Sequence, residues 1–242
     1  MPFLEANGAQ LFYTDSGDPD GVPVLLIAPG GMKSADGLWA NMPWNPHDRL
    51  GDGYRIIGMD QRNAGQSTAP VSADDGWDTY TADQLAVLDH LGIDRFAIIG
   101  MCIGGPYVMG VVKAAGDRVQ AAVLLQPIGL DDNHQAFYDM FDAWKADIVH
   151  LHPEADEATW EAFRSNMYDG EFMFNTSPDE VAAIDTPLLV AMGNDLYHPQ
   201  STSRAIAELA PNVTFVEQWK DDEHLPAADD AFRAFLAAHT AS

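Results

Sequence analysis

The sequence predicts an α/β protein in which a mostly parallel sheet is flanked by helices and carries a small helical cap. Several short, nearly continuous apolar runs are typical of strands that are buried on both faces of a sheet. Segments with helical spacing lie between these runs, and this alternation is how consecutive parallel strands are connected. One segment of the chain, residues 131–180, contains helical patterns only. A length of 242 residues is sufficient for one domain with a sizeable core.

The strands and helices follow one another from the N-terminus. Asn7-Gly8 suits the positive φ angles of a tight turn, and it predicts a hairpin between the first two strands. The expected strands span residues 3–6, 10–13, 22–28, 54–59, 96–99, 121–125, 187–192 and 213–219. The expected helices span residues 79–91, about 104–116, 201–210 and 227–239. Leu85, Leu88 and Leu91 recur at helical spacing and indicate the buried face of the first helix.

The segment 131–180 is expected to form the cap, between a core made of residues 1–130 and 181–242. Its apolar residues follow two helical stripes: Phe137, Met140, Phe141, Trp144 and Ile148, then Trp160, Phe163 and Met167. Most of these side chains are expected to pack in a core. A helical insertion beyond the carboxyl ends of the strands would also cover the usual ligand site of an α/β sheet. The expected pocket-lining residues are Met32, Met101, Phe137, Met140 and Trp144.

The charge and cysteine content exclude several functions. Asp and Glu number 37 against 12 Lys and Arg, so the formal net charge is −25. Nucleic acids and anionic membranes would be repelled, so the expected partner is a small-molecule substrate. The sequence leaves the oligomeric state open. Scarce lysine and excess acid also allow adaptation to high salt, where cations screen the repulsion. A single cysteine forms no internal disulfide, and we see neither a membrane-spanning run nor a secretory signal; we expect a cytoplasmic protein.

The most informative motif is Gly100-Met101-Cys102-Ile103-Gly104, which lies between an expected strand and an expected helix. A sharp strand-to-helix turn exposes its central residue and requires small residues two positions away on either side. The positive end of the helix dipole lowers the pKa of a thiol at this position. Cysteine is also a common buried hydrophobic residue. The context favours Cys102 as a catalytic nucleophile.

A histidine and a carboxylate are expected to activate this nucleophile, in the chain order nucleophile, acid, histidine. Asp195 follows the strand at 187–192, and His224 lies between the last strand and the last helix. Asp131, after the strand at 121–125, is the alternative acid. His198 is the alternative base, but it follows Asp195 by only three residues, so we expect His224 to pair with Asp195.

The oxyanion of an acyl-transfer reaction would need two converging N–H donors. One is the backbone N–H of Ile103, directly after the nucleophile. Gly31, in the glycine-rich loop after the strand at 22–28, is expected to supply the second, with Met32 as the alternative. We find no GxGxxG motif, P-loop or spaced Cys/His cluster, so neither a cofactor nor a metal is expected.

These motifs resemble those of the α/β-hydrolase superfamily along essentially the whole chain. Pro29-Gly30-Gly31 takes the place of that family's His-Gly loop. Residues 60–67 (DQRNAGQS) are similar to its Asp-x-Arg-Gly-x-Gly-x-Ser segment, with Asn63 replacing a glycine. Residues 193–199 are similar to the loop that carries the family's acid.

The nucleophile departs from the family pattern, because Cys102 replaces the usual serine. Its turn resembles that of dienelactone hydrolases, whereas the expected cap resembles capped enzymes that cleave esters, lactones and C–C bonds. The resemblance implies acyl chemistry and disfavours dehalogenase or epoxide hydrolase activity, which needs a carboxylate at the turn. We therefore expect a hydrolase that acts on an ester or lactone through an acyl-cysteine. The alternatives are an acyltransferase with the same triad and a non-catalytic ligand-binding protein on this fold.

Overall fold

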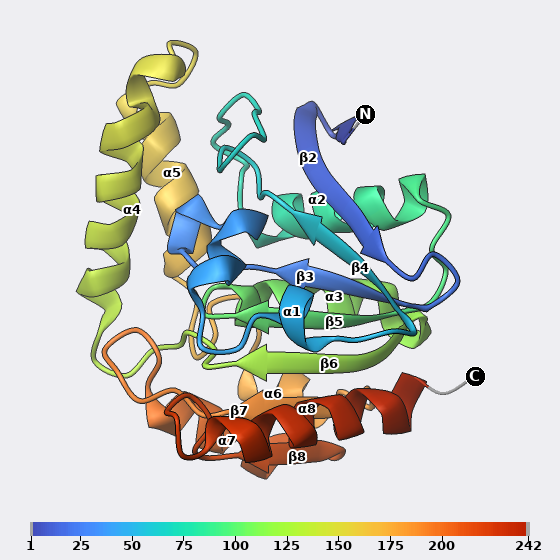
Figure 1. The fold of residues 1–242 in the computed structure, drawn as a ribbon. Coiled ribbons are helices and arrows are strands. Elements are labelled where there is room, and N and C mark those ends of the chain that lie inside the picture. The colour runs from blue at the N-terminus through green and yellow to red at the C-terminus, as the bar shows by residue number, and fades with distance from the viewer. Residues whose placement is uncertain (1, 241–242) are drawn as a thin grey trace.

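A computed structural model describes residues 2–240, which form one eight-stranded sheet with helices on both faces (Figure 1). The strand order is β1-β2-β4-β3-β5-β6-β7-β8. The strands are β1 (Phe3–Ala6), β2 (Ala9–Gly17), β3 (Val22–Ile27), β4 (Tyr54–Met59), β5 (Phe96–Met101), β6 (Val119–Leu125), β7 (Leu188–Ala191) and β8 (Val213–Val216). The pairs β1–β2 and β2–β4 are antiparallel, and every other neighbouring pair is parallel. The predicted fold class is confirmed.

Eight α-helices and four short 3-10 helices complete the described residues. The α-helices are α1 (Pro46–Arg49), α2 (Trp77–His90), α3 (Gly104–Ala115), α4 (His134–Ile148), α5 (Glu157–Tyr168), α6 (Pro178–Ala182), α7 (Gln200–Leu209) and α8 (Leu225–Thr240). The 3-10 helices are η1 (Gly31–Lys33), η2 (Asp36–Asn41), η3 (Gly116–Arg118) and η4 (Val149–Leu151). The predicted hairpin turn is present, since Asn7 and Gly8 have φ angles of 50° and 73°.

The sheet separates two hydrophobic clusters, as the continuous apolar strands predict. Leu25 and Ile27 of β3 point to a cluster with side chains of α2 and α3, whereas Val24 and Leu26 point to a cluster with side chains of α8. These four side chains have no exposed surface. Successive strand residues point to opposite faces, so strands covered on both sides must be apolar throughout. This packing fixes the carboxyl ends of β3, β5 and β6 side by side.

Helices α4 and α5 stand beside the carboxyl ends of these strands (Figure 1). The indole N–H of Trp77, at the start of α2, donates to the Met167 carbonyl of α5 at 2.7 Å. Asn166 of α5 donates through its side chain to the carbonyls of Ala73 and Asp75, at 2.8 and 2.9 Å. The end of α5 is therefore held against the sheet domain at several points. The division into a cap at 131–180 and a core of 1–130 and 181–242 stays a prediction.

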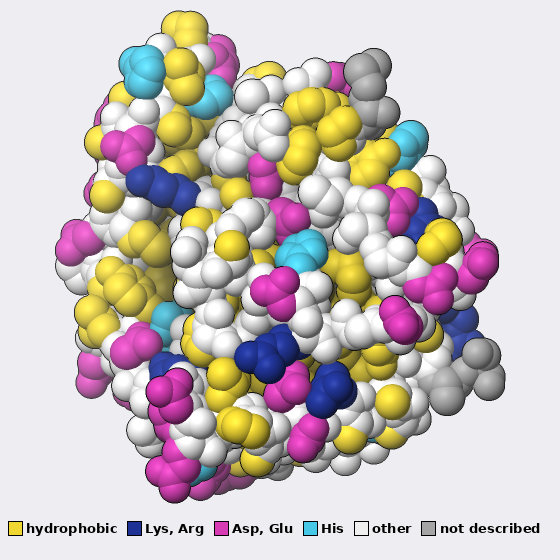
Figure 2. All heavy atoms as spheres, viewed as in Figure 1, with side chains coloured by type: hydrophobic (Ala, Val, Ile, Leu, Met, Phe, Trp, Pro, Cys, Tyr) yellow, Lys and Arg dark blue, Asp and Glu magenta, His cyan; other side chains and the backbone are white. Residues whose placement is uncertain are grey.

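Acidic side chains are spread over the face shown in Figure 2, with basic side chains interspersed among them. Several of the few cations make ion pairs, such as Arg55 with Asp15 at 2.7 Å and Lys33 with Asp147 at 2.5 Å. Within residues 2–240, every helix is too short or too polar to cross a membrane.

Candidate active site

Cys102 occupies the turn between β5 and α3. Its φ angle is 62°, a left-handed value that is rare for residues other than glycine. The turn is held by three backbone hydrogen bonds: Cys102 N–H donates to Leu125 O at 3.0 Å, and Cys102 O accepts from Gly105 and Ile128, at 3.0 and 3.2 Å. The side chain is partly exposed. Strand, turn and helix thus hold the thiol in one strained conformation at the carboxyl edge of the sheet.

The glycines beside Cys102 are required by close backbone contacts. A Cβ atom on Gly100 would overlap the Gly104 carbonyl and lie 2.6 Å from a methyl group of Val108. A Cβ atom on Gly104 would lie 2.7 Å from the Ile27 carbonyl oxygen of β3. These contacts leave no room for a larger residue, as the sequence pattern predicts for a strained turn of this kind.

A tight turn between β7 and α7 brings Asp195 and His198 together. The N–H of His198 donates to the Asp195 carbonyl at 3.2 Å, and the N–H of Asp195 donates to the His198 carbonyl at 3.3 Å. The imidazole Nδ1 lies 2.7 Å from Asp195 Oδ1. The cap side also restrains this turn, because Asn133 donates to the Leu196 carbonyl at 2.7 Å and Phe137 packs on Tyr197.

The other ring nitrogen of His198, Nε2, is buried and has no conventional hydrogen-bond partner among residues 2–240. The Cys102 thiol interacts with this imidazole. Burial opposes ionisation of this thiol, but the imidazole of His198 and the N–H groups of Gly30 and Ile103 outweigh burial, so the pKa of Cys102 is lowered. Burial likewise opposes the charged form of His198, yet Cys102 and Asp195 outweigh it, and the pKa of His198 is raised. These opposite shifts favour a thiolate–imidazolium pair.

Asp195 completes the arrangement as a carboxylate. Its partial burial opposes ionisation, but hydrogen bonds from the His198 side chain and from the His198 and Tyr197 backbones lower its pKa. The three side chains therefore form a continuous series: thiol, imidazole and carboxylate. The predicted nucleophile and acid lie together, with His198 between them.

The structure places His224 elsewhere than the sequence suggested. Its Nδ1 lies 2.7 Å from Asp221 Oδ1, and the ring is 35% exposed; it makes no hydrogen bond to Cys102 or Asp195. His198 follows Asp195 by three residues, a spacing that disfavours it in the sequence alone. The tight turn nevertheless places His198 Nδ1 against the Asp195 carboxylate and leaves Nε2 without a hydrogen-bond partner in the described part of the chain. Asp131, the alternative acid, accepts instead from Ser201 at 2.7 Å.

The glycine-rich loop after β3 lies beside the Cys102 turn. The N–H groups of Gly30 and Ile103 both interact with the Cys102 sulfur, and Gly31 as an oxyanion donor stays a prediction. Gly31 is covered by Met140 of α4, whose sulfur would overlap a Cβ atom at that position. The loop itself is held by a hydrogen bond from Ser34 Oγ to the Ala28 carbonyl at 2.6 Å.

The expected pocket residues lie in different places. Met101 packs on the face of the sheet covered by α8, away from the cap. Phe137 and Trp144 are buried in the other cluster, 0% and 2% exposed, and Met32 is 2% exposed. Tyr168, which no sequence motif marks, is fully buried, and its hydroxyl donates to the Met32 sulfur at 3.4 Å.

The segment after β4 has the conformation that its sequence requires. Asn63 has a φ angle of 57°, so it adopts the left-handed conformation expected from the glycine that it replaces. Asp60 accepts from the N–H groups of Asp36 and Gln66, both at 2.8 Å. Arg62 pairs with Asp83 at 2.9 Å inside the protein. This segment fixes the loops around η1 and α2.

Comparison with known proteins shows what this chain is similar to. A non-heme chloroperoxidase from Streptomyces lividans is 36% identical over 124 residues, which are 51% of this chain and 43% of that protein. Epoxide hydrolase A from Mycobacterium tuberculosis is 31% identical over 235 residues, 93% of this chain and 64% of that protein. The chain thus spans less than two thirds of the length of these curated relatives.

Solved structures share the fold. The enol-lactonase from Burkholderia xenovorans LB400 superposes with a TM-score of 0.72 at 19% identity, covering 98% of this chain and all of that one. A family model described as the alpha/beta hydrolase fold matches residues 23–170. That match runs from the second residue of β3 past the end of α5, and it includes the Cys102 turn and both helices of the expected cap. The chain belongs to the α/β-hydrolase fold family.

Proposed function

We propose that this protein is a hydrolase that cleaves a carboxylic ester or lactone through an acyl-cysteine intermediate. Cys102 is the nucleophile, His198 the base and Asp195 the acid that orients the base. One observation supports this assignment above all: His198 contacts Asp195 through Nδ1 and has a buried, otherwise unpartnered Nε2 beside the Cys102 thiol. A nucleophile, its base and a group that orients the base form the minimal unit of covalent catalysis.

In the acylation step, the Cys102 thiolate attacks the carbonyl carbon of the substrate. A C–S bond forms, and the carbonyl π electrons move to the oxygen, which becomes an oxyanion. The N–H groups of Gly30 and Ile103 stabilise this charge, because they already converge at the sulfur. When the tetrahedral intermediate collapses, the C–O bond breaks and the His198 imidazolium donates its proton to the leaving alkoxide.

In the deacylation step, neutral His198 accepts a proton from water, and the resulting hydroxide attacks the thioester carbonyl. The C–S bond breaks, the thiolate leaves, and the carboxylic acid product departs. Asp195 stabilises the imidazolium that forms in this step and fixes the ring so that Nε2 faces the reacting atoms.

The surroundings of the site favour a small to medium, partly apolar acyl group. Met140 and Tyr168 contact the glycine-rich loop, and Phe137 packs on Tyr168. Lys33, the basic residue nearest the glycine-rich loop in sequence, forms an ion pair with Asp147 at 2.5 Å. The likeness to an enol-lactonase supports including lactones among the substrates to be tested.

Intact-protein and peptide mass spectrometry after rapid acid quenching would test this proposal. The protein is mixed with a panel of activated esters and lactones of increasing acyl length. We expect an acyl group on the peptide that contains Cys102, and no adduct on the Cys102→Ala variant. Turnover by Cys102→Ala at the wild-type rate would contradict the proposal, as would failure of every panel member to acylate the wild-type protein.

A further inference from the structure

The hydroxyl of Tyr168 is a buried polar group that the proposed mechanism does not use. Tyr168 ends α5 and has no exposed surface. Its hydroxyl donates to the sulfur of Met32 at 3.4 Å, and a thioether is a weak acceptor. Buried hydroxyl groups normally have a strong acceptor, because an unsatisfied one is costly. The weak partner leaves most of the donor capacity of Tyr168 free.

This hydroxyl lies against the loop that supplies one of the proposed oxyanion donors. Met32 belongs to the same loop as Gly30, whose N–H interacts with the Cys102 sulfur. His198, which serves the leaving group, comes from a different loop, after β7. The charge of Cys102 also influences Tyr168: burial, and then the neighbouring charges of Tyr80 and Cys102, raise the pKa of the phenol well above its ordinary value. Tyr168 therefore stays protonated and remains a donor.

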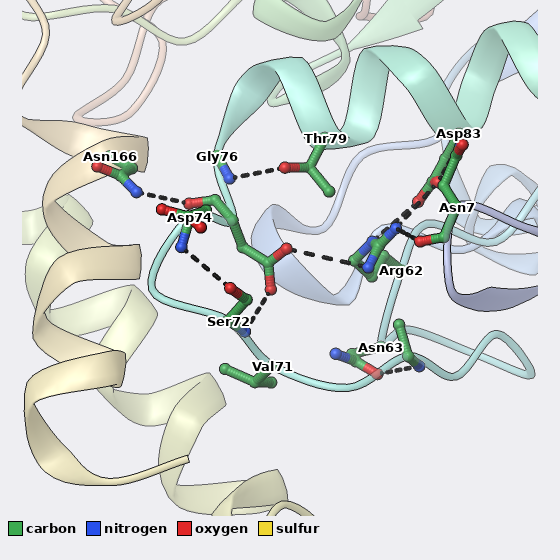
Figure 3. Close-up of polar contacts among 12 residues, drawn as sticks. Asn7, Arg62, Asn63, Val71, Ser72, Asp74, Gly76, Thr79, Asp83 and Asn166 are labelled. Atoms are coloured by element: carbon green, nitrogen blue, oxygen red, sulfur yellow. Dashed lines mark hydrogen bonds and ion pairs between the residues drawn. The ribbon is translucent and has the colours of Figure 1, made fainter. Parts of the chain in front are cut away.

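The fold holds Tyr168 rigidly. Its ring packs on Phe137 at 5.6 Å and on Phe174 at 5.2 Å between ring centroids. The residues before it are fixed by the loop that precedes α2. Figure 3 shows Asn166 reaching toward the backbone of this loop, whose Ser72 and Gly76 make further hydrogen bonds.

The loop before α2 also contacts a buried group of charged side chains. Arg62 lies between Asp83, at 2.9 Å, and Asp75 of the loop, at 3.9 Å, and all three side chains are nearly inaccessible to solvent (Figure 3). Because these contacts already fix Tyr168, its hydroxyl does not need to move when charge develops on the substrate. Such preorganised donors are the ones that stabilise a transition state most.

We propose that the Tyr168 hydroxyl donates a hydrogen bond to the carbonyl oxygen of the bound acyl group, as a third oxyanion donor beside Gly30 and Ile103. This inference rests on the proposed acyl-cysteine function. The hydrogen bond to Met32 is exchanged for one to the substrate oxygen, which becomes a stronger acceptor as it gains negative charge. Tyr168 would thus be a catalytic residue supplied by the cap.

The test compares Tyr168→Phe with Tyr107→Phe. Both substitutions remove one oxygen from a fully buried tyrosine that packs on Trp77, but the Tyr107 hydroxyl has no partner among residues 2–240, Met32 included. Rates are normalised to the fraction of Cys102 that iodoacetamide alkylates, so that misfolded protein is not counted. We expect Tyr168→Phe to lower kcat about 100- to 1,000-fold with KM little changed, as for loss of one oxyanion donor. Tyr107→Phe should retain wild-type kinetics.

A second readout separates this role from a structural one. Butyraldehyde adds reversibly to a catalytic thiolate to give a thiohemiacetal, whose oxygen occupies the oxyanion position. Its inhibition constant should rise in Tyr168→Phe by a factor similar to the fall in kcat, while the melting temperature stays near the wild-type value. Equal kinetics for Tyr168→Phe and the wild type, or equal losses in both variants, would overturn the inference alone. Failure of the wild type to acylate Cys102 would overturn the proposed function, and the inference with it.

Discussion

Two Asp–His pairs in this protein have the same local geometry and different surroundings. Asp195 and His198 are three residues apart, as are Asp221 and His224, and in both pairs Nδ1 lies 2.7 Å from Oδ1. Each pair follows a strand and precedes a helix, near the carboxyl edge of the sheet. A search for an imidazole oriented by a carboxylate would therefore find both pairs and could not choose between them.

The pairs differ in burial and in what faces the second ring nitrogen. The His198 side chain is 11% exposed, and its Nε2 lies beside Cys102; the His224 side chain is 35% exposed, and its hydrogen bond is to Asp221. In a buried site, charge interactions are less screened by solvent, so only the first pair shifts the pKa of the thiol. Tertiary position, not the turn motif, thus distinguishes a catalytic pair from a solvated one.

Of the paired substitutions, those that remove the two imidazoles should differ most in their effects on kcat/KM. We expect His198→Ala to lower kcat/KM at least about 10⁴-fold, because the thiolate loses its proton partner and the leaving group loses its acid. His224→Ala, the matched control, should change kcat/KM less than about 3-fold, since it removes an exposed ion pair only. Steady-state kinetics on the best ester or lactone substrate, with thermal melting to verify folding, would measure both.

The reverse ranking would break this comparison. If His224→Ala were inactive and His198→Ala active, the loop after β8 would have to move onto Cys102 when substrate binds. The Cys–His–Asp assignment would then return to the residues that sequence spacing alone suggested.

The carboxylates should show the same contrast with a smaller amplitude. Asp195→Asn keeps the shape of the side chain but cannot stabilise the imidazolium, so we expect kcat to fall up to about 10⁴-fold. Asp221→Asn should leave kcat within about 2-fold of the wild type, because Asp221 is an exposed surface residue. Comparable losses in both variants would indicate an effect on folding rather than on the site.

The pH dependence of alkylation should distinguish the pairs without any substrate. Only the thiolate reacts with iodoacetamide, so the rate rises with pH through the pKa of Cys102, which His198 lowers below its ordinary value. In His198→Ala the burial of the thiol remains and its main stabilising partner is lost, so the midpoint should move to higher pH. His224→Ala should leave the curve unchanged. A wild-type midpoint at or above that of a free thiol would contradict the thiolate–imidazolium pair.

The fold could be predicted well because its signals are local and periodic. Continuous apolar strands such as β3 and β5 must be buried on both faces, and they alternate with helices, which requires parallel pairing. The structure adds η2 and α1 between β3 and β4, where the chain has no long apolar period. The strained turn was also predictable, because Gly100 and Gly104 sit where a side chain would overlap neighbouring backbone.

The rest of the candidate site depends on contacts between distant segments. Nothing in the local sequence separates His198 from His224, since both follow an aspartate by three residues. The Gly30 N–H interacts with Cys102, and Met140 of α4 covers Gly31; no local pattern in the sequence predicts either contact. Tyr168 carries no motif, and its position comes from interactions with the loop before α2. Only the three-dimensional structure brings these residues together.

The central claim is that Cys102 and His198 form a coupled thiolate–imidazolium pair. NMR titration of labelled histidines tests this claim most directly. The imidazole signals are assigned with His198→Ala and His224→Ala and followed before and after Cys102 is capped as a neutral methyl disulfide. Loss of the thiolate removes the main interaction that opposes the burial of His198, so its pKa should fall, whereas the His224 signals should not change. A pKa of His198 that does not change when Cys102 is capped, or a change in the His224 signals instead, would contradict the account.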